Sequence, residues 1–409
     1  MFENPLILLG GNPLFLGMLN REKFHAKEII VFDWSEDPPV KGDLHIQCDI
    51  KDSERILDWL EKNHVKQIRG ALTMTDVGVP TQRKIHERYG FLVPTEQSIT
   101  DAMIKGRAQS IWRKAGLLTR FSKTFESIPP IDQLPDKDLI VKPNFSNGSN
   151  GITIIRKDSR DEFKSAFDLA QKISWEHKVI VEEFIETRGG QATEFVVDML
   201  GDSFGNVEVW GIAKKYNSKF NPHNGIGVKN HYNPADVSDS TLEKIANRAV
   251  ELYKAIGVHT SFGDMDLILD SSGEIHPLDF GTRTSGFIGS DLLDEINPPR
   301  IFVNEYLDVI RGKRIGNGYT ARKELSSIYF FYDLGDCIIK HESNLMEFLP
   351  STIKNLYYDR SALKIGNHLR IPIKDVERSG FEIMCGARKD LTIETIIDAE
   401  ERFAKFVTE

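Results

Sequence analysis

Two aspartates in the segment GDMDLILDSSGEIHPLDFGTR (263–283) have the type and spacing that could hold a divalent cation. The turn-forming residues Asp270 to Gly273 separate two strand-like runs and predict a β-hairpin. Counted back from this turn, Asp279 lies about opposite Asp266. Carboxylates on one face of adjacent strands repel each other unless a cation lies between them. Magnesium bound by carboxylates and phosphate oxygens would satisfy this arrangement, so we interpret Asp266 and Asp279 as metal ligands.

Two more charged residues lie beside this pair. Asp264 shares a strand face with Asp266, because side chains two residues apart in a strand point the same way. Arg283, four residues after Asp279, is placed to offset negative charge that develops during a reaction. The simpler alternative is a pair of acids on a solvated face.

A lysine followed by a polar, glycine-rich loop precedes this hairpin in VKPNFSNGSNGITII (141–155). Lys142 would place a point charge on phosphate groups, and Gly148 and Gly151 would let backbone amides approach them. The loop lacks the closing GK[ST] of a Walker motif. An ordinary polar hairpin is the competing interpretation.

The apolar run VIVEEFI (179–185) contains two adjacent acids. Because consecutive side chains of a strand face opposite ways, either Glu182 or Glu183 points to the interior or into a cleft. A carboxylate that points inward needs a basic partner or a ligand amine. An edge strand with both acids solvated is the alternative.

Alternating strands and helices are predicted to position these residues. Apolar runs at 4–9, 28–34 and 67–74, with a helix predicted over 52–65, indicate parallel β-α-β units. Residues 1–95 are therefore predicted to form an open parallel α/β domain.

The middle of the chain mixes helices with antiparallel-looking strands, which is not the pattern of a doubly wound domain. The long polar stretch 216–238 is typical of a functional lid or a mobile loop. Short strands and a terminal helix follow in the C-terminal part. We expect helices over 98–116, 160–175 and 392–407, and strands over 138–143, 151–155, 179–185, 193–200 and 207–216.

Composition excludes several classes of protein. A net charge of −9 argues against nucleic acid as a partner, because phosphate backbones need a basic surface. No run approaches the length of a membrane span, and the N-terminus reads as a first strand rather than a signal peptide. Cys48, Cys337 and Cys385 form no ligand-spaced pair. We expect a soluble, cytoplasmic protein without a membrane or nucleic-acid partner.

Taken in order, these segments resemble the ATP-grasp superfamily of carboxylate–amine ligases. The resemblance is greatest to the branch shared by biotin carboxylase, carbamoyl phosphate synthetase and the L-amino acid ligases, and it covers most of the chain. It implies an N-terminal open parallel α/β domain (1–95), a central ATP-grasp domain with mixed and antiparallel sheets (96–312) and a small C-terminal α+β region (313–409). The smaller lobe of the central domain is expected over about 118–185. The expected fold class is thus α/β combined with α+β.

The resemblance also implies roles for individual residues. Lys105, eleven residues before Gly116, takes the place of the lysine that meets the α-phosphate. Lys142 takes that of the second nucleotide lysine, and Glu194 is the candidate for binding the ribose. The implied flexible loop over the phosphates includes Ser146, Gly148, Ser149 and Gly151, and the implied adenine contacts are the Glu182 side chain, the Glu183 or Phe184 carbonyl and the Ile185 amide. The implied metal ligands are Asp266 and Asp279, with Arg283 as the arginine of the E-x-N-x-R pattern.

The sequence departs from that pattern in two places. The usual asparagine between the second acid and the arginine is Gly281, which removes one ligand for a metal or a phosphate. Both acids are aspartate rather than the commoner glutamate, so their carboxylates reach less far. Asp264 could replace the missing ligand or receive the amine of a substrate.

The implied activity is an ATP- and magnesium-dependent ligase, with manganese as a substitute metal, that joins a small carboxylate to an amine. An amino acid or a peptide-like substrate is favoured, and related ligases suggest a homodimer. Lys214 and Lys215 precede the stretch 216–238, which would close over an acyl phosphate. The alternatives are a catalytically weakened ATP-binding module, motivated by Gly281, and an ATP-grasp ligase for a sugar acid or another biosynthetic carboxylate. A dehydrogenase based on Gly10 and Gly11 is disfavoured, because the third glycine of the dinucleotide fingerprint is missing.

Overall fold

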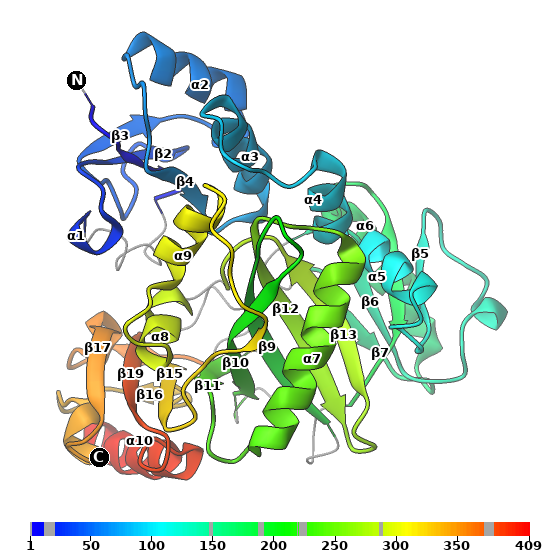
Figure 1. Ribbon diagram of the computed structural model, residues 1–409. Coiled ribbons are helices and arrows are strands. Elements are labelled where there is room, and N and C mark those ends of the chain that lie inside the picture. The colour runs from blue at the N-terminus through cyan, green and yellow to red at the C-terminus, as the bar shows by residue number, and fades with distance from the viewer. Residues whose placement is uncertain are drawn as a thin grey trace.

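A four-stranded parallel sheet opens the chain in the computed structural model (Figure 1). Its strands are β1 (Leu6–Leu9), β2 (Ile29–Asp33), β3 (Leu44–Gln47) and β4 (Gly70–Thr73), in the order β3-β2-β1-β4. The structure describes residues 2–11, 21–146, 150–186, 192–218, 220, 227–285, 289–371 and 380–409. The predicted β-α-β pattern is confirmed.

Short helices complete this N-terminal part. α1 (Arg21–Phe24) precedes β2, and α3 (Val79–Arg88) follows β4. α2 (Ser53–Lys62) begins at the predicted place, where the Asp52 side chain accepts a hydrogen bond from the Arg55 amide and caps the helix. Because the strands are parallel, the segment after β4 leaves from the carboxyl edge of the sheet, the edge at which α/β sheets usually bind ligands.

The helix predicted over 98–116 is two helices, so that prediction was wrong in one respect. α4 (Glu96–Met103) ends at Ile104, whose ψ of 108° is extended, and α5 (Lys105–Lys114) starts directly afterwards. The break makes Lys105 the first residue of α5, and its amide donates a hydrogen bond to the Asn144 carbonyl.

A second, antiparallel sheet carries the lysine loop. Its strands are β5 (Ser122–Phe125), β6 (Leu139–Pro143), β7 (Thr153–Ile155) and β8 (Val179–Glu183), in the order β5-β8-β6-β7. The predicted strands over 138–143, 151–155 and 179–185 are confirmed. Phe163 and Phe167 of α6 (Phe163–Ile173) are buried in one cluster with Val141 and Val181 of this sheet.

The largest sheet has nine strands and joins the middle of the chain to its C-terminal part. The strand order is β13-β12-β9-β10-β11-β15-β19-β17, and β14 pairs with β10. The strands are β9 (Ala192–Gly201), β10 (Val207–Asn217), β11 (Gly227–Tyr232), β12 (Ser261–Asp270), β13 (Ile275–Gly281), β14 (Gly318–Tyr319), β15 (Leu325–Phe331), β17 (Lys354–Asp359) and β19 (Phe381–Ala387).

The polar stretch 216–238 is not a plain loop, because it contains β11. Lys229 of this strand is buried and pairs with Glu400 at 3.2 Å, and His231 is buried against Ser326 at 2.8 Å. These two polar residues of β11 are therefore buried together with polar partners, and the polar composition of the stretch did not predict a strand here. Residues 219 and 221–226 lie outside the described chain.

Helices cover the large sheet. The apolar side of α7 (Asp239–Ile256) is buried in one cluster with residues of β9, β10, β12 and β13, and α10 (Ile393–Thr408) is buried against β15 and β19 (Figure 1). α8 (Gly289–Ile296) and α9 (Phe302–Val309) share a core with both the N-terminal sheet and the large sheet. A short pair, β16 (Cys337–Ile338) and β18 (His368–Leu369), shares an apolar cluster with α10. Among the described residues, no helix combines the length and the apolar character needed to cross a bilayer.

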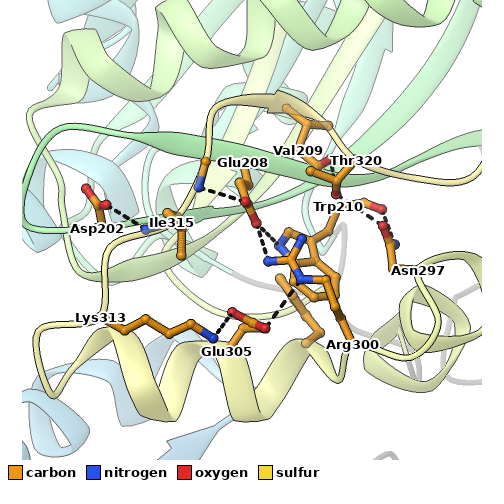
Figure 2. Close-up of polar contacts among 12 residues, drawn as sticks. Asp202, Glu208, Val209, Trp210, Asn297, Arg300, Glu305, Lys313, Ile315 and Thr320 are labelled. Carbon is orange, nitrogen blue, oxygen red and sulfur yellow. Dashed lines mark hydrogen bonds and ion pairs between the residues drawn. The ribbon is translucent and has the colours of Figure 1, made fainter.

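A polar cluster fixes the connection from α9 to β15 against the edge of β10 (Figure 2). The buried Glu208 accepts hydrogen bonds from the Gly316 amide at 2.8 Å and from Arg300 at 2.7 Å. The Arg300 guanidinium also lies over the Trp210 ring, 4.3 Å from its centre. Further contacts are Lys313 with Glu305 at 2.7 Å, and the Ile315 amide with Asp202 at 3.0 Å. These contacts hold the chain close where it re-enters the large sheet.

Candidate functional site

The two aspartates of the hairpin lie opposite each other, as predicted. In the antiparallel pairing of β12 with β13, Asp266 faces Asp279 and Asp264 faces Gly281. Both carboxylates belong to the end of the hairpin that is away from its turn. Their oxygen atoms match the ligand preference of magnesium, so the donor set fits this ion.

A lysine accompanies each of these carboxylates. Lys105 lies 2.6 Å from Asp279, and Lys215 lies 3.4 Å from Asp266. Lys215, on β10, also pairs with Glu194 of the neighbouring β9. Burial alone would lower the pKa of both lysines, but the surrounding carboxylates outweigh burial and raise it. The lysines are therefore charged, and their positive charges offset the negative charges of Asp279 and Asp266.

The position of Lys105 depends on Asn144, at the end of β6. The Lys105 amide donates to the Asn144 carbonyl at 3.2 Å, and the Gly106 amide donates to the Asn144 side chain at 2.9 Å. A Cβ atom on Gly106 would lie 2.1 Å from Thr124, so only glycine fits there. The start of α5 is thus held against the sheet that carries Lys142.

Arg283 contacts one acid of the large sheet and one from the segment that follows the N-terminal sheet. It pairs with Asp264 of β12, and its Nε lies 3.1 Å from Oδ1 of Asp76, in the segment that follows β4. Its Nη1 also donates to the Thr284 carbonyl at 3.0 Å. The arginine that the sequence singled out is therefore oriented by carboxylates, as a residue that meets developing negative charge needs to be.

A buried acid, Asp198 of β9, lies opposite Asp264 in the sheet. It accepts hydrogen bonds from the Tyr232 hydroxyl at 2.7 Å and the Ser285 amide at 3.2 Å. Burial raises the pKa of both Asp198 and Asp264, against the opposing effects of these hydrogen bonds and of Arg283. Burial likewise raises the pKa of Asp266, although Lys215 opposes it. The carboxylates are crowded, and a cation would relieve that crowding.

Glu182 is the acid of VIVEEFI that points inward, and it is fully buried. Arg120 lies 2.5 Å from it, Lys142 lies 3.1 Å from it, and Gln109 donates to it at 3.0 Å. Burial would raise the pKa of Glu182, but Arg120, Lys142 and Gln109 together lower it to about 2. Glu182 thus fixes Lys142 in place. Its contact with adenine remains a prediction.

The other residues expected around the nucleotide lie along the same sheet. Glu183 pairs with Lys137, and the Phe184 amide donates to the Asp138 carbonyl at 2.9 Å. Gly151 has a φ of 77°, and a Cβ atom there would lie 2.8 Å from Ile173, so glycine is required. Ser146 and Ile185 are half-buried, whereas Gly148 and Ser149 lie outside the described residues.

Among the residues that the structure describes, sequence reasoning missed five that contact the predicted site residues. Gln109 could have been found, because it lies one helical turn after Lys105 on the same face. Asp76 follows a predicted strand, as ligand-binding residues of parallel sheets do, but nothing in the sequence linked it to Arg283. The full set is Asp76, Gln109, Arg120, Asn144 and Asp198.

Comparison with known proteins identifies the domain family of the central part of the chain. Residues 136–291 match the model of the ATP-grasp domain family. The chain is 29% identical over 147 residues to the D-alanine–D-alanine ligase of Actinobacillus succinogenes, an overlap of 35% of this chain and 43% of that protein. The chain spans about half the length of the curated relatives it matches.

Two solved structures share the fold along nearly the whole chain. The L-amino acid ligase from Bacillus licheniformis superposes with a TM-score of 0.70 at 18% identity, covering 100% of this chain and 98% of its own. The biotin carboxylase domain of Hydrogenobacter thermophilus 2-oxoglutarate carboxylase, solved with MgADP, has a TM-score of 0.69 at 15% identity, covering 99% and 90%. The chain therefore contains an ATP-grasp domain and has the ATP-grasp fold, and the expected fold class is confirmed.

Proposed function

We propose that this ATP-grasp protein is an ATP-dependent ligase that joins a carboxylate to an amine. The observation that carries the proposal is the set of ion pairs at the end of the β12–β13 hairpin. There, Lys105 pairs with Asp279, and Lys215 pairs with Asp266. Basic groups for phosphate and acidic groups for a metal thus meet at one place, and no nucleophilic side chain is needed.

Magnesium would be held by Asp266 and Asp279, where it would neutralise charge on the phosphates. Lys105 and Lys142 would then bind the nucleotide phosphates, and Glu182 would keep Lys142 in position through their contact at 3.1 Å. Glu194 stays our candidate for the ribose. The Glu182 side chain, the Glu183 or Phe184 carbonyl and the Ile185 amide stay our candidates for the adenine. Ser146, Gly148, Ser149 and Gly151 are proposed to cover the phosphates.

The proposed reaction has two steps. A carboxylate oxygen of the substrate attacks the γ-phosphorus, the bond to the β-phosphate oxygen breaks, and ADP leaves. The amine nitrogen then attacks the acyl carbon, loses a proton and expels inorganic phosphate. Arg283 and Lys215 would stabilise the charge on the transferring phosphoryl group, and Asp264 would orient Arg283 or receive the amine.

The test is ADP release from ATP and magnesium with pools of carboxylic acids and amines, beginning with the twenty L-amino acids. We expect at least one pool to stimulate release, and mass spectrometry to find a product joined by an amide bond. Intact nucleotide binding without stimulation by any pool, amino acid or sugar acid, would contradict the proposal. That result would favour the weakened ATP-binding module that Gly281 suggested.

Other properties belong to the same proposal. We propose amino acids or peptide-like molecules as substrates, in line with the ligase names of the similar proteins. We propose that manganese can substitute for magnesium. We also propose that the protein acts in the cytoplasm and assembles as a homodimer. The division into parts at 1–95, 96–312 and 313–409 also remains a proposal.

A further inference from the structure

Gly281 leaves a space that a residue from a distant part of the chain fills. It is the last residue of β13, two positions before Arg283. A Cβ atom on Gly281 would lie 3.4 Å from Cζ of Arg283 and 3.4 Å from Oδ1 of Asp76. A longer side chain would therefore meet the guanidinium and the carboxylate that now contact each other there.

The backbone holds Asp76 firmly in this place. After β4, the Thr75 amide donates to the Thr73 hydroxyl at 3.2 Å, and the Gly78 amide donates to the Thr75 carbonyl at 3.0 Å. A Cβ atom on Gly78 would lie 2.3 Å from the Thr73 hydroxyl, so the turn can close this tightly only with glycine. The Asp76 carboxylate is thus presented at the carboxyl edge of the N-terminal sheet.

Asp76 contacts two nitrogens on one side of the Arg283 guanidinium. Nε lies 3.1 Å from Oδ1, and Nη2 lies 3.5 Å from Oδ2. On the other side of the guanidinium, Nη1 donates a hydrogen bond to the Asp264 carboxylate. The side chains of Arg283 and Asp76 are only 20% and 18% exposed, so water competes weakly for this pair. The plane of the guanidinium is therefore set by Asp264 of β12 and by Asp76 of the segment after β4.

We propose that Asp76 is a positioning residue, which aims Arg283 at the transferring phosphoryl group from the space beside Gly281. This inference rests on the proposed ligase function. It also gives the N-terminal part of the chain a role in the chemistry, because the orientation of the arginine depends on a residue that directly follows β4.

The first experiment compares ADP release and ligand binding in Asp76→Ala and wild type. We expect Asp76→Ala to lower kcat for ADP release with the twenty-amino-acid pool by roughly 10- to 100-fold. KM for ATP should change by less than about threefold, because Arg283 acts on the transition state rather than on bound ATP. Asp76→Asn, which keeps one oxygen acceptor, should fall between the two proteins.

A second readout does not need turnover. ADP, magnesium and aluminium fluoride together mimic the transferring phosphoryl group, whereas AMP-PNP mimics bound ATP. Asp76→Ala should weaken binding of the aluminium fluoride complex by roughly tenfold more than binding of AMP-PNP, measured by calorimetry. Equal weakening of both ligands, or of neither, would overturn the inference.

The third experiment exchanges the two side chains. Gly281→Asn in the Asp76→Ala background should recover roughly tenfold of the lost kcat, because the amide enters the vacated space. Gly281→Asn alone should lower kcat, because the amide then meets both Asp76 and Arg283. Failure of the double variant to exceed Asp76→Ala would count against the inference.

A matched control separates this role from general loss of contact between the sheets. Asp308→Ala removes another ion pair with the N-terminal part of the chain, to Arg69, which directly precedes β4, at 3.4 Å. It should leave kcat and both binding constants unchanged, and an equal loss in this variant would overturn the inference. If wild type releases no ADP with any pool, the ligase proposal fails, and the aluminium fluoride comparison alone decides the role of Asp76.

Discussion

At the scale of single residues, the site pairs the cationic groups proposed for phosphate with the acids proposed for the metal. Lys105 holds Asp279, and Lys215 holds Asp266. Phosphate groups would need these lysines, and a metal would need these aspartates. Each ligand therefore releases the group that the other requires. Binding of metal and nucleotide should be coupled for this reason, and the coupling must be reciprocal.

This coupling gives a prediction for Asp279→Asn. In wild type, magnesium should tighten AMP-PNP binding by roughly tenfold or more, and in Asp279→Asn most of that effect should be lost. Titration calorimetry with and without magnesium measures both. Asp101→Asn, which removes the partner of Arg107 at 3.4 Å, is the control and should behave as wild type. An undiminished magnesium effect in Asp279→Asn would show that this carboxylate is not a metal ligand.

At the scale of elements, the sequence predicted correctly those features that are determined by neighbouring residues, such as turns and the alternation of side chains along a strand. The hairpin of β12 and β13 could be paired in register, because its turn residues and alternating side chains fix which acids meet. The break at Ile104 could not be predicted, because neither a proline nor a glycine occupies that position. Contacts with Asn144 determine where α5 begins. β11 was hidden for a similar reason. Its polar residues Lys229 and His231 find their partners on α10 and β15, far along the chain.

The buried His86 gives a pH prediction for the N-terminal sheet. Its Nε2 accepts a hydrogen bond from the Ala71 amide of β4 at 2.8 Å, which requires the neutral ring. Burial, helped by Arg311, lowers the pKa of His86 to about 3 from an ordinary value of 6.5. The unfolded chain therefore takes up a proton that the folded chain excludes. This contribution to stability is complete above pH 6.5 and is lost as the pH falls toward 3.

The expected loss from His86 between pH 7.5 and pH 5 is about 2 kcal/mol of unfolding free energy. His86→Gln should be less stable than wild type at pH 7.5 but lose about 2 kcal/mol less on acidification. Urea unfolding at the two pH values measures this difference. His64→Asn, at an exposed histidine of the same part of the chain, should keep the wild-type pH dependence. Parallel pH profiles for wild type and His86→Gln would refute the assignment.

At the scale of the whole molecule, the N-terminal sheet is tied to the rest by a few polar contacts around an apolar core. Gln82 donates to the Tyr306 hydroxyl of α9 at 2.7 Å. Lys23 of α1 lies 2.7 Å from Asp291 and 2.7 Å from Asp294, both on α8. Sequence patterns carry no record of such long-range pairs, which is also why Asp76 and Arg120 escaped prediction.

Lys23 is the contact of this kind whose loss should cost most. Lys23→Met keeps the apolar stem but leaves two acids on α8 without their cation. Because Asp294 is largely buried, we expect a loss of about 3 kcal/mol in unfolding free energy. Lys27→Met removes an exposed pair with Glu3 nearby and should leave the urea midpoint close to that of wild type. Similar urea midpoints for the two variants would argue against the role of Lys23.

The meeting of Asp76 with the bare backbone at Gly281 has a consequence for how such sequences diverge. The two positions are far apart in the chain but share one small volume beside Arg283. A lineage that gains a side chain at the position of Gly281 can lose the carboxylate at the position of Asp76. A lineage that gains this carboxylate can in turn lose the side chain at the position of Gly281. Among homologues, an amide at the position of Gly281 should therefore accompany a residue other than an acid at that of Asp76. The two substitutions should be inherited as a pair.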